Sequence, residues 1–340
     1  MPWPFASDWP ICWKGTYESI RARNNLNSVE TFARRSLAHR PRPCFPGRFP
    51  VTGNPAKVAL GEIRSNELGF SRLAVLAAAL DSYLLDIVDV DFSACTWFDA
   101  NMSAPLGVVF VHALDNLNTL KPCGLRQGVE TILAKNHFLT GFGFPERADT
   151  HGTTIPYHRF SATDDRYFAA YLNRHLRGKD LPIMSEALSQ RFKNSILEIF
   201  VNAAMHSESK LGIFACGQYF PQQNRLDFCV ADAGLGVRRK IYKELGLKMN
   251  SDKAIEWALQ EGNTTRKGSV PGGLGLKLIR EFIAMNKGRI QIVSDRGYWE
   301  FSPQGETLTR MDTSFPGTVI DIEINTADTS SYRLRAESKN

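Results

Sequence analysis

Near its middle the chain reads Glu198-Ile-Phe-Val-Asn202-Ala-Ala-Met-His206. Glu198, Asn202 and His206 are four residues apart, so on a helix each step turns by only about 40° and the three share one face. The residues around them are mostly apolar: Ile196, Leu197, Ile199, Phe200, Val201 and Met205. The pattern predicts a long helix with a polar stripe that faces either solvent or a pocket. Ser185 predicts its N-cap, because a serine hydroxyl accepts from the first free backbone amides.

The polar stripe carries residue types that suit phosphate chemistry. Asn202 is short, neutral and oxygen-bearing, so it can complete the shell of a magnesium ion that keeps waters and takes phosphate oxygens. Glu198, one turn away, can orient or deprotonate an attacking water. A solvent-exposed helix face that binds no ligand would show the same polar stripe.

A second cluster follows a strand-like run. Phe228-Cys-Val-Ala231 predicts a buried strand, which ends in Asp232-Ala-Gly-Leu-Gly236. Gly234 and Gly236 predict a tight turn or a close approach by another group. A carboxylate beside such glycines can accept a hydrogen bond from the exocyclic amine of adenine, whereas guanine presents a carbonyl there. Asp and Gly are also the ordinary residues of turns.

A third cluster combines hydroxyls, glycines and a helix start. It reads Thr264-Thr265-Arg266, then Pro271-Gly272-Gly273-Leu274-Gly275-Leu276, and leads into an apolar helical run. Glycines before a helix let backbone amides point at an anion, and the helix dipole adds to the attraction. The cluster predicts a phosphate cradle, and the polar insert between Gly236 and Gly272 predicts a lid. It is not a P-loop, because Gly-x-x-x-x-Gly-Lys-Ser/Thr is missing from the sequence.

These three clusters, in this order, resemble the ATP-site boxes of the GHKL superfamily, which includes gyrase, chaperone ATPases, histidine kinases and mismatch-repair ATPases. The Glu-x-x-x-Asn box closely resembles that of anti-sigma-factor serine kinases. The resemblance covers residues 185–325 and implies a two-layer α/β sandwich with a mixed sheet, of the α+β kind. It also implies ATP and Mg²⁺ as cofactors.

The resemblance gives each matching residue a role. Glu198 would act as the general base and Asn202 would bind Mg²⁺. Asp232 would recognise adenine. Thr318, after Gly317 at the start of the last strand, would support adenine recognition. The other ATP-binding positions would form the pocket and lid: Gly234, Gly236, Thr264, Thr265, Gly272, Gly273, Leu274, Gly275 and Leu276.

The sequence differs from that of histidine kinases in two respects. Pro271 stands where histidine kinases have the first glycine of Gly-Thr-Gly-Leu-Gly-Leu, which puts the lid motion in question. None of the seven histidines lies in a phosphoacceptor pattern, and the nearest, His175, lacks the acidic neighbour. A self-phosphorylating histidine kinase is therefore not expected.

The segment before this domain predicts a small α/β domain. Helical spacing runs from Ser65 to Leu85, and Leu84 to Asp91 alternates toward a strand. In Phe98-Asp-Ala-Asn101, Asp99 or Asn101 is expected to cap an apolar helix whose body is residues 105–117. Further helices are expected at 127–139 and 164–176, and strands at 211–220, 226–231, 289–294 and 318–324.

The strand, turn and helix of residues 88–111 resemble a STAS domain, the α/β module of anti-sigma-factor antagonists. That family has a phosphorylated Asp-Ser at the helix start, but this chain has Asp99-Ala100, so the resemblance implies no phosphate switch there. Any strand-to-helix turn of an α/β domain would give the same pattern.

Charge separates the first 60 residues from the rest. They hold nine Lys or Arg against three acidic residues, which equals the net charge of +6 of the whole chain, together with eight of 17 prolines and three Trp. Such a basic, aromatic arm could contact nucleic acid or an acidic partner. Packing on its own protein or on a second copy is the preferred interpretation.

The expected order is therefore a basic arm (1–60), a STAS-like domain (61–150), a linker and helix (151–185), the ATP-binding domain (186–326) and a tail (327–340). The six cysteines lack metal or disulfide spacing, and no apolar run approaches the roughly 20 residues that span a bilayer. We expect a cytoplasmic protein without a membrane partner.

The expected activity is Mg²⁺-dependent ATP hydrolysis or serine phosphotransfer that controls a partner protein. The alternatives are a non-catalytic, ATP-gated interaction module and a nucleic-acid ATPase that uses the arm. A homodimer is a further expected assembly.

Overall fold

A five-stranded antiparallel sheet lies at the centre of the structure, a computed structural model that describes residues 55–339 except 261, 264 and 266–273. The strands run in the order β4-β6-β7-β9-β8. Their bounds are β4 Thr154–Phe160, β6 Ile213–Phe220, β7 Arg225–Asp232, β9 Gly305–Asn325 and β8 Arg289–Ser302. The fold belongs to the α+β class, as expected. The expectation of a mixed sheet is wrong, because every pair in this sheet is antiparallel.

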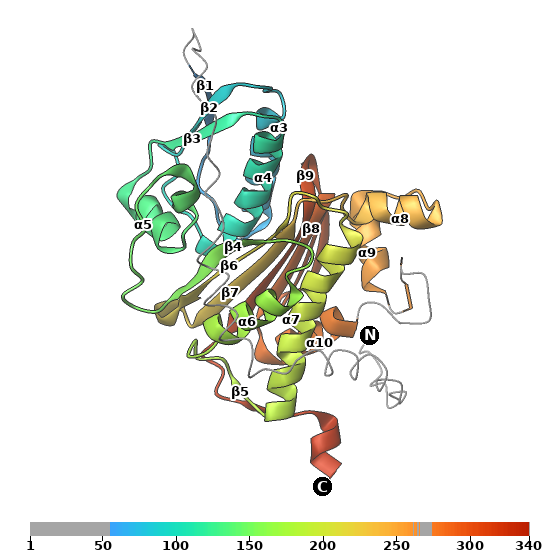
Figure 1. Ribbon diagram of the computed structural model, residues 1–340. Coiled ribbons are helices and arrows are strands. Elements are labelled where there is room, and N and C mark those ends of the chain that lie inside the picture. Colours follow the sequence, from blue (N-terminus) through green and yellow to red (C-terminus); the bar gives the residue numbers. More distant parts are fainter. Residues whose placement is uncertain (1–54, 261, 264, 266–273, 340) are drawn as a thin grey trace. The chain divides into compact units, whose positions relative to one another are not determined.

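Three helices cover one face of the sheet (Figure 1): α6 (Asp165–His175), α7 (Glu186–His206) and α10 (Leu274–Asn286). Ser185 caps α7 as predicted, with its hydroxyl accepting from the Leu188 amide at 3.2 Å. Aromatic rings fill the layer between, including Phe200 and Phe228. This burial, rather than helix propensity, stabilises the layer, since a buried Phe contributes about 1.5–3 kcal/mol.

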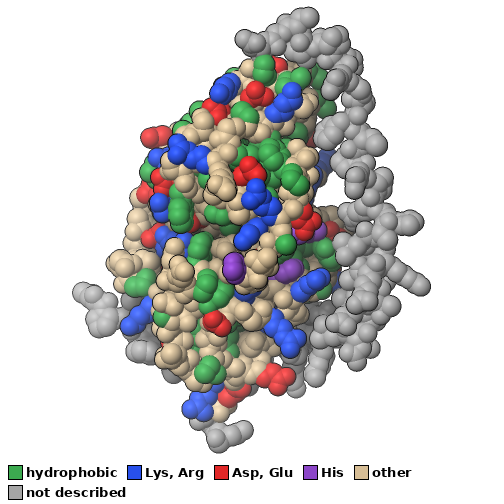
Figure 2. Space-filling view, turned by 90° about the vertical axis from the view of Figure 1, so that its left-hand side faces the viewer, with side chains coloured by type: hydrophobic (Ala, Val, Ile, Leu, Met, Phe, Trp, Pro, Cys, Tyr) green, Lys and Arg blue, Asp and Glu red, His purple; other side chains and the backbone are tan. Residues whose placement is uncertain are grey.

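The opposite face is covered by an α/β module (Figure 1). It contains β1 (Ala56–Ala59), α3 (Glu67–Leu80), β2 (Ile87–Asp91), α4 (Ser103–Asp115), β3 (Thr119–Cys123), α5 (Gln127–Lys135) and the 3₁₀ turns Ala100–Met102 and Leu139–Phe142. The three strands pair in parallel in the order β1-β2-β3. Lys and Arg are interspersed with Asp and Glu on the side of the module that carries α5 (Figure 2).

Module and sheet share one apolar core. Phe70 and Leu73 of α3 belong to the same buried cluster as Phe214, Cys229 and Val319 of the sheet. Residues Gly53–Asn340 accordingly form one compact unit. The 154–160 stretch, expected in a linker, is the edge strand β4 of the sheet.

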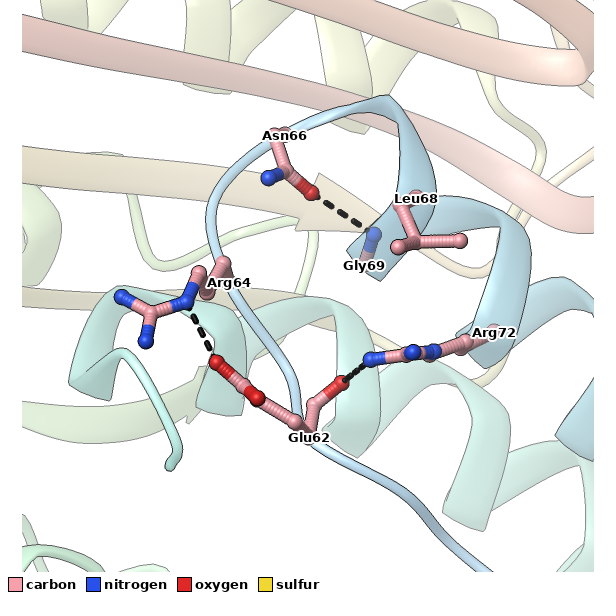
Figure 3. A pocket seen from close by; sticks show the side chains of 6 residues that line it. All are labelled: Glu62, Arg64, Asn66, Leu68, Gly69 and Arg72. Atoms are coloured by element: carbon pink, nitrogen blue, oxygen red, sulfur yellow. Dashed lines mark hydrogen bonds and ion pairs between the residues drawn. The ribbon is translucent and has the colours of Figure 1, made fainter. Parts of the chain in front are cut away.

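The start of α3 is built by a side-chain cap. The Asn66 Oδ1 atom accepts from the Gly69 amide at 2.9 Å (Figure 3). Gly69 has no room for a Cβ, which would lie 1.9 Å from the carbonyl oxygen of Arg64. The loop before the helix is therefore held close to its first turn.

The expected capping of the next helix is wrong. α4 begins after the 3₁₀ turn, and neither Asp99 nor Asn101 caps it with a side chain. Asp99 accepts from the Ser65 amide at 2.8 Å, and Asn101 donates to Asp321 at 2.7 Å. Both side chains form hydrogen bonds with segments distant in sequence, and these hydrogen bonds replace the local capping bonds.

Those contacts form a polar seam between module and sheet, made of Ser65, Asn101, Gln291 and Asp321. The Ser65 hydroxyl donates to Asp321 at 2.7 Å, and its oxygen lies 3.2 Å from the Gln291 Oε1 atom. All four residues are buried. Burial raises the pKa of Asp321, although the hydrogen bonds from Ser65 and Asn101 work against that rise. Hydrogen bonding of this kind makes a buried polar group tolerable and fixes the register of the surfaces that carry it.

The β8–β9 hairpin is longer than the sequence predicts. Beyond Ser294 and Thr318 it continues through an irregular register to Ser302 and Gly305. Two helices of the expected lid insert, α8 (Val237–Leu245) and α9 (Ser251–Leu259), lie beside this hairpin (Figure 1). Gly297 of β8 permits the close approach, since a Cβ there would lie 2.6 Å from the Ser251 carbonyl oxygen.

The C-terminal segment returns to the start of α7. β10 (Ser331–Tyr332) pairs with β5 (Ile183–Met184), and the turns Pro221–Gln223 and Arg335–Lys339 are 3₁₀ helices. None of the helices in the described residues combines the length and apolar character that crossing a bilayer requires.

Candidate functional site

Asp232 ends β7 on the side of the sheet that faces α7 and α10. It alternates with Phe228 and Val230, which pack in that helical layer. Its side chain is 6% exposed, and its Oδ1 atom accepts from the Gly234 amide at 2.9 Å. Across the ladder it pairs with Thr318 of β9. Two residues that the sequence assigns to adenine thus meet at one sheet edge.

The Asp232 carboxyl is held in an environment that disfavours its charge. Burial raises the pKa of Asp232 to about 7, while hydrogen bonds from the Gly234 and Thr318 backbones work against the rise. The group is therefore close to half-ionised near neutral pH. A ligand N–H that donates to it would stabilise the charged form.

Ser294 joins this edge from β8. Its hydroxyl lies 3.1 Å from the Thr318 hydroxyl and accepts from the Val237 amide, the first of α8, at 2.9 Å. Gly236 approaches closely with φ +76°, and a Cβ there would lie 2.9 Å from the Ser294 oxygen. The sequence reasoning missed Ser294, although the alternation Ile290, Ile292, Ser294 could have indicated it.

The turn after Asp232 is pressed against the end of α7. A Cβ on Gly234 would lie 2.1 Å from the Ser207 carbonyl oxygen, which accepts from the Leu235 amide at 2.9 Å. Asn202 and Glu198 precede Ser207 by about 7.5 and about 13.5 Å along the helix axis, at 1.5 Å per residue. Both are half-buried and make contacts. The turn after Asp232 therefore meets the C-terminal end of the helix that carries Asn202 and Glu198.

The direction of α10 brings its beginning toward the same edge. At its other end, Asn286 donates to the Asn325 carbonyl at 2.8 Å, where β9 finishes. Phe282, late in α10, contacts Phe192, early in α7, with ring centroids 5.1 Å apart. The two helices are therefore antiparallel, and the Leu274 end of α10 points toward the edge where β7 ends. The half-buried Leu276 packs in the helical layer.

Part of the predicted phosphate cradle lies outside the described residues. This holds for Thr264, Gly272 and Gly273. Thr265 is described and is half-buried, while Leu274 and Gly275 form the first turn of α10.

Two described cavities lie away from the Asp232 edge. One of about 130 Å³, beside the Asn66 cap, contains the Arg64–Glu62 ion pair (Figure 3). It is smaller than the roughly 300–1,000 Å³ usual for small-molecule sites. The other, of about 660 Å³, lies at the opposite end of α7.

Comparison with known proteins gives no family. No protein-family model matches the chain, and no curated protein matches it. Within the described residues, no group of three His, Cys, Asp or Glu side chains could hold a metal ion.

Proposed function

We propose that the chain is an ATP-binding regulatory protein with a GHKL-like nucleotide site at the Asp232 edge. The observation that carries this proposal is the buried Asp232 carboxyl, whose residue pairs across the ladder with Thr318, the residue whose hydroxyl contacts that of Ser294. Burying a carboxylate is costly unless donors satisfy it. The exocyclic amine of adenine is such a donor, and guanine offers an acceptor instead.

The turn after Asp232 matches the expected position of the second sequence cluster. Gly234 and Gly236 let its backbone pack directly against Ser207 and Ser294. The residues around Asp232 concern only the adenine end of the proposed ATP ligand. Binding of its phosphates depends on the cluster before α10 that the sequence predicts to bind phosphate. Helix N-termini attract phosphate through free amides and the helix dipole.

The catalytic part of the proposal concerns α7. ATP bound with Mg²⁺ supplies a phosphoanhydride bond whose cleavage releases free energy. Asn202 would offer its amide oxygen to the metal, and Glu198 would orient a water or a partner's serine hydroxyl and take its proton. The activity would be an ATPase or a serine protein kinase.

Calorimetric titration tests nucleotide recognition. ATP and GTP are titrated with and without Mg²⁺ into the parent, Asp232→Asn and Asp227→Asn proteins. Asp227 is the matched control, because it is a buried carboxyl on the same strand but on the opposite face. We expect the parent and the control to prefer ATP, and Asp232→Asn to lose at least tenfold in ATP affinity together with the preference. Equal affinity of the parent for ATP and GTP would refute the proposal.

An exposed leucine cluster supports a second candidate, an ATP-gated interaction module. Leu84, Leu85 and Leu117 are all more than two-thirds exposed, and the Leu85 amide donates to Asn116, next to Leu117. Leu85 and Leu117 have left-handed backbones (φ 56° and 59°), which are costly for such residues. This candidate predicts an ATP-dependent protein complex that persists in Glu198→Ala.

Nucleic-acid binding through the basic arm is the least supported candidate. Its arm lies almost wholly outside the described residues, and charges of both signs mix on the face in Figure 2. It predicts a steep salt dependence of affinity that disappears when residues 1–54 are removed. The truncation leaves β1 intact.

A further inference from the structure

A cavity of about 660 Å³ lies at the start of α7, remote from the Asp232 edge. Its walls are the end of α6 with the loop that follows, and the first turns of α7. Lys193, on the α7 wall, precedes Ser207 by 14 residues, or about 21 Å of helix. The volume falls in the range of roughly 300–1,000 Å³ that small-molecule sites occupy.

A buried lysine forms part of the wall. The side chain of Lys179 belongs to a residue only 7% exposed, and its ammonium group donates to the carbonyl oxygen of Gly152. Burial lowers the pKa of Lys179, and the nearby Asp149 charge works against that change. No carboxylate in the described residues lies within ion-pair distance of this ammonium group. A buried cation whose partner is a carbonyl is electrostatically undercompensated.

Two more cations line the cavity without a counter-charge. Arg177 is exposed and Lys193 half-buried, and in the part of the chain that the structure describes neither forms an ion pair. The cavity wall has a single carboxylate, Asp180, which already accepts a hydrogen bond from the Tyr219 hydroxyl. Among the lining residues, three cations face one carboxylate, and Asp149, which acts on Lys179 from outside the lining, offsets part of this positive charge.

We propose that this cavity binds a small molecule that carries a phosphate group. A phosphate dianion would balance the positive charge of the lining and present oxygens to Arg177 and Lys193. Arg177 offers a planar fork, while the lysines offer ammonium groups that adapt in direction. Asn173 and Ser189 supply further polar groups at the wall. Leu181, which is half-buried, supplies apolar surface for the body of the ligand.

The test uses the full chain with inorganic phosphate and glycerol 3-phosphate as probes. Binding is followed by titration calorimetry in the parent, in Lys193→Ala and in the double variant Arg177→Ala/Lys193→Ala. Lys135→Ala is the control, since Lys135 is also a half-buried helical lysine but lies in α5. We expect the Kd of both probes to rise at least tenfold in the double variant and to be unchanged in the control. Thermal unfolding of each variant verifies that it is folded.

Backbone amide spectra show where the probes bind. We expect the resonances of Gly178 and Asp180 to move on addition of phosphate, while those of Gly234 and Gly236 stay in place. Shifts confined to Gly234 and Gly236, with unchanged affinity in the double variant, would overturn the cavity proposal and leave the ATP proposal intact. Absence of saturable binding of either probe to the parent would overturn it as well.

Discussion

The buried carboxyl of Asp232 makes the stability of the folded chain depend on pH. The pKa of its carboxyl is about 7 in the folded chain, against an ordinary value of 3.8. The folded state therefore binds more protons than the unfolded state between these values, and the stability contributed by the protonated carboxyl is lost as pH rises through 7.

Replacing Asp232 by Asn should remove that loss. We expect the ligand-free Asp232→Asn protein to exceed the parent by about 2–4 kcal/mol in free energy of unfolding at pH 8, and to match it near pH 4. Urea denaturation at the two pH values measures the difference. Asp81→Asn, the same substitution at an exposed position, is the control. A gain of equal size at both pH values would contradict the assignment.

Gly234 is required where the Asp232 turn meets α7. In Gly234→Ala the new Cβ would have to avoid the backbone oxygen of Ser207. We expect a loss of at least about 2 kcal/mol in the free energy of unfolding, since backbone cannot yield as a side chain does. Gly128→Ala is the control, because Gly128 lies in α5 with open space around it. Its stability should stay equal or rise by up to about 1 kcal/mol.

Single residues were predictable where their partners are close in sequence. Ser185 caps α7 because the amide that it accepts from is three residues away. Asp99 and Asn101 instead bond to Ser65 and Asp321, at separations of 34 and 220 residues. Capping rules consider only residues within a few positions of the helix start, so they cannot predict hydrogen bonds to such distant partners.

At the scale of elements, α7 joins the two ends of the helical layer. Its last residues meet the Asp232 turn, and its first residues line the phosphate cavity proposed above. Its start was predictable, because the Ser185 cap is a local feature of the sequence. The outer part of the β8–β9 hairpin was missed, since its pairing depends on a long irregular register and on cover from α9.

Glu198 tests whether α7 catalyses or only binds. We expect Glu198→Ala to lower ATP turnover by about 10²–10⁴-fold, the usual contribution of a general base, with the Kd for ATP changed less than threefold. Glu186→Ala, in the exposed first turn of the same helix, should keep full turnover. Equal turnover in parent and Glu198→Ala would favour the non-catalytic module.

Across the whole molecule, the shared core should make module and sheet unfold together. Both faces of the sheet are buried, one by the helices and one by the module. We expect amides of α4 and β7 to exchange hydrogen through the same global opening, with equal free energies in denaturant-dependent exchange. A fragment of residues 151–340 should be insoluble, because Phe214, Cys229 and Val319 would be exposed. Separate unfolding steps for α4 and β7 would contradict this.

The sequence predicted most helices and strands of the module and of the sheet, but it did not predict that the module packs on the sheet. Each strand pattern indicates burial, but it does not specify which segment covers the second face. The module supplies part of that cover through residues that are distant in sequence from the strands, as Phe70 is from Phe214 in the same buried cluster.

Asp321 accepts hydrogen bonds from Ser65 and Asn101, which precede it by 256 and 220 positions. A change at any one of the three leaves a donor or an acceptor buried without its partner, at a cost of about 1–3 kcal/mol. Descendants of this gene can therefore tolerate a replacement at one of these sites chiefly when a second mutation compensates for it. In an alignment of such descendants, columns 65, 101 and 321 should covary.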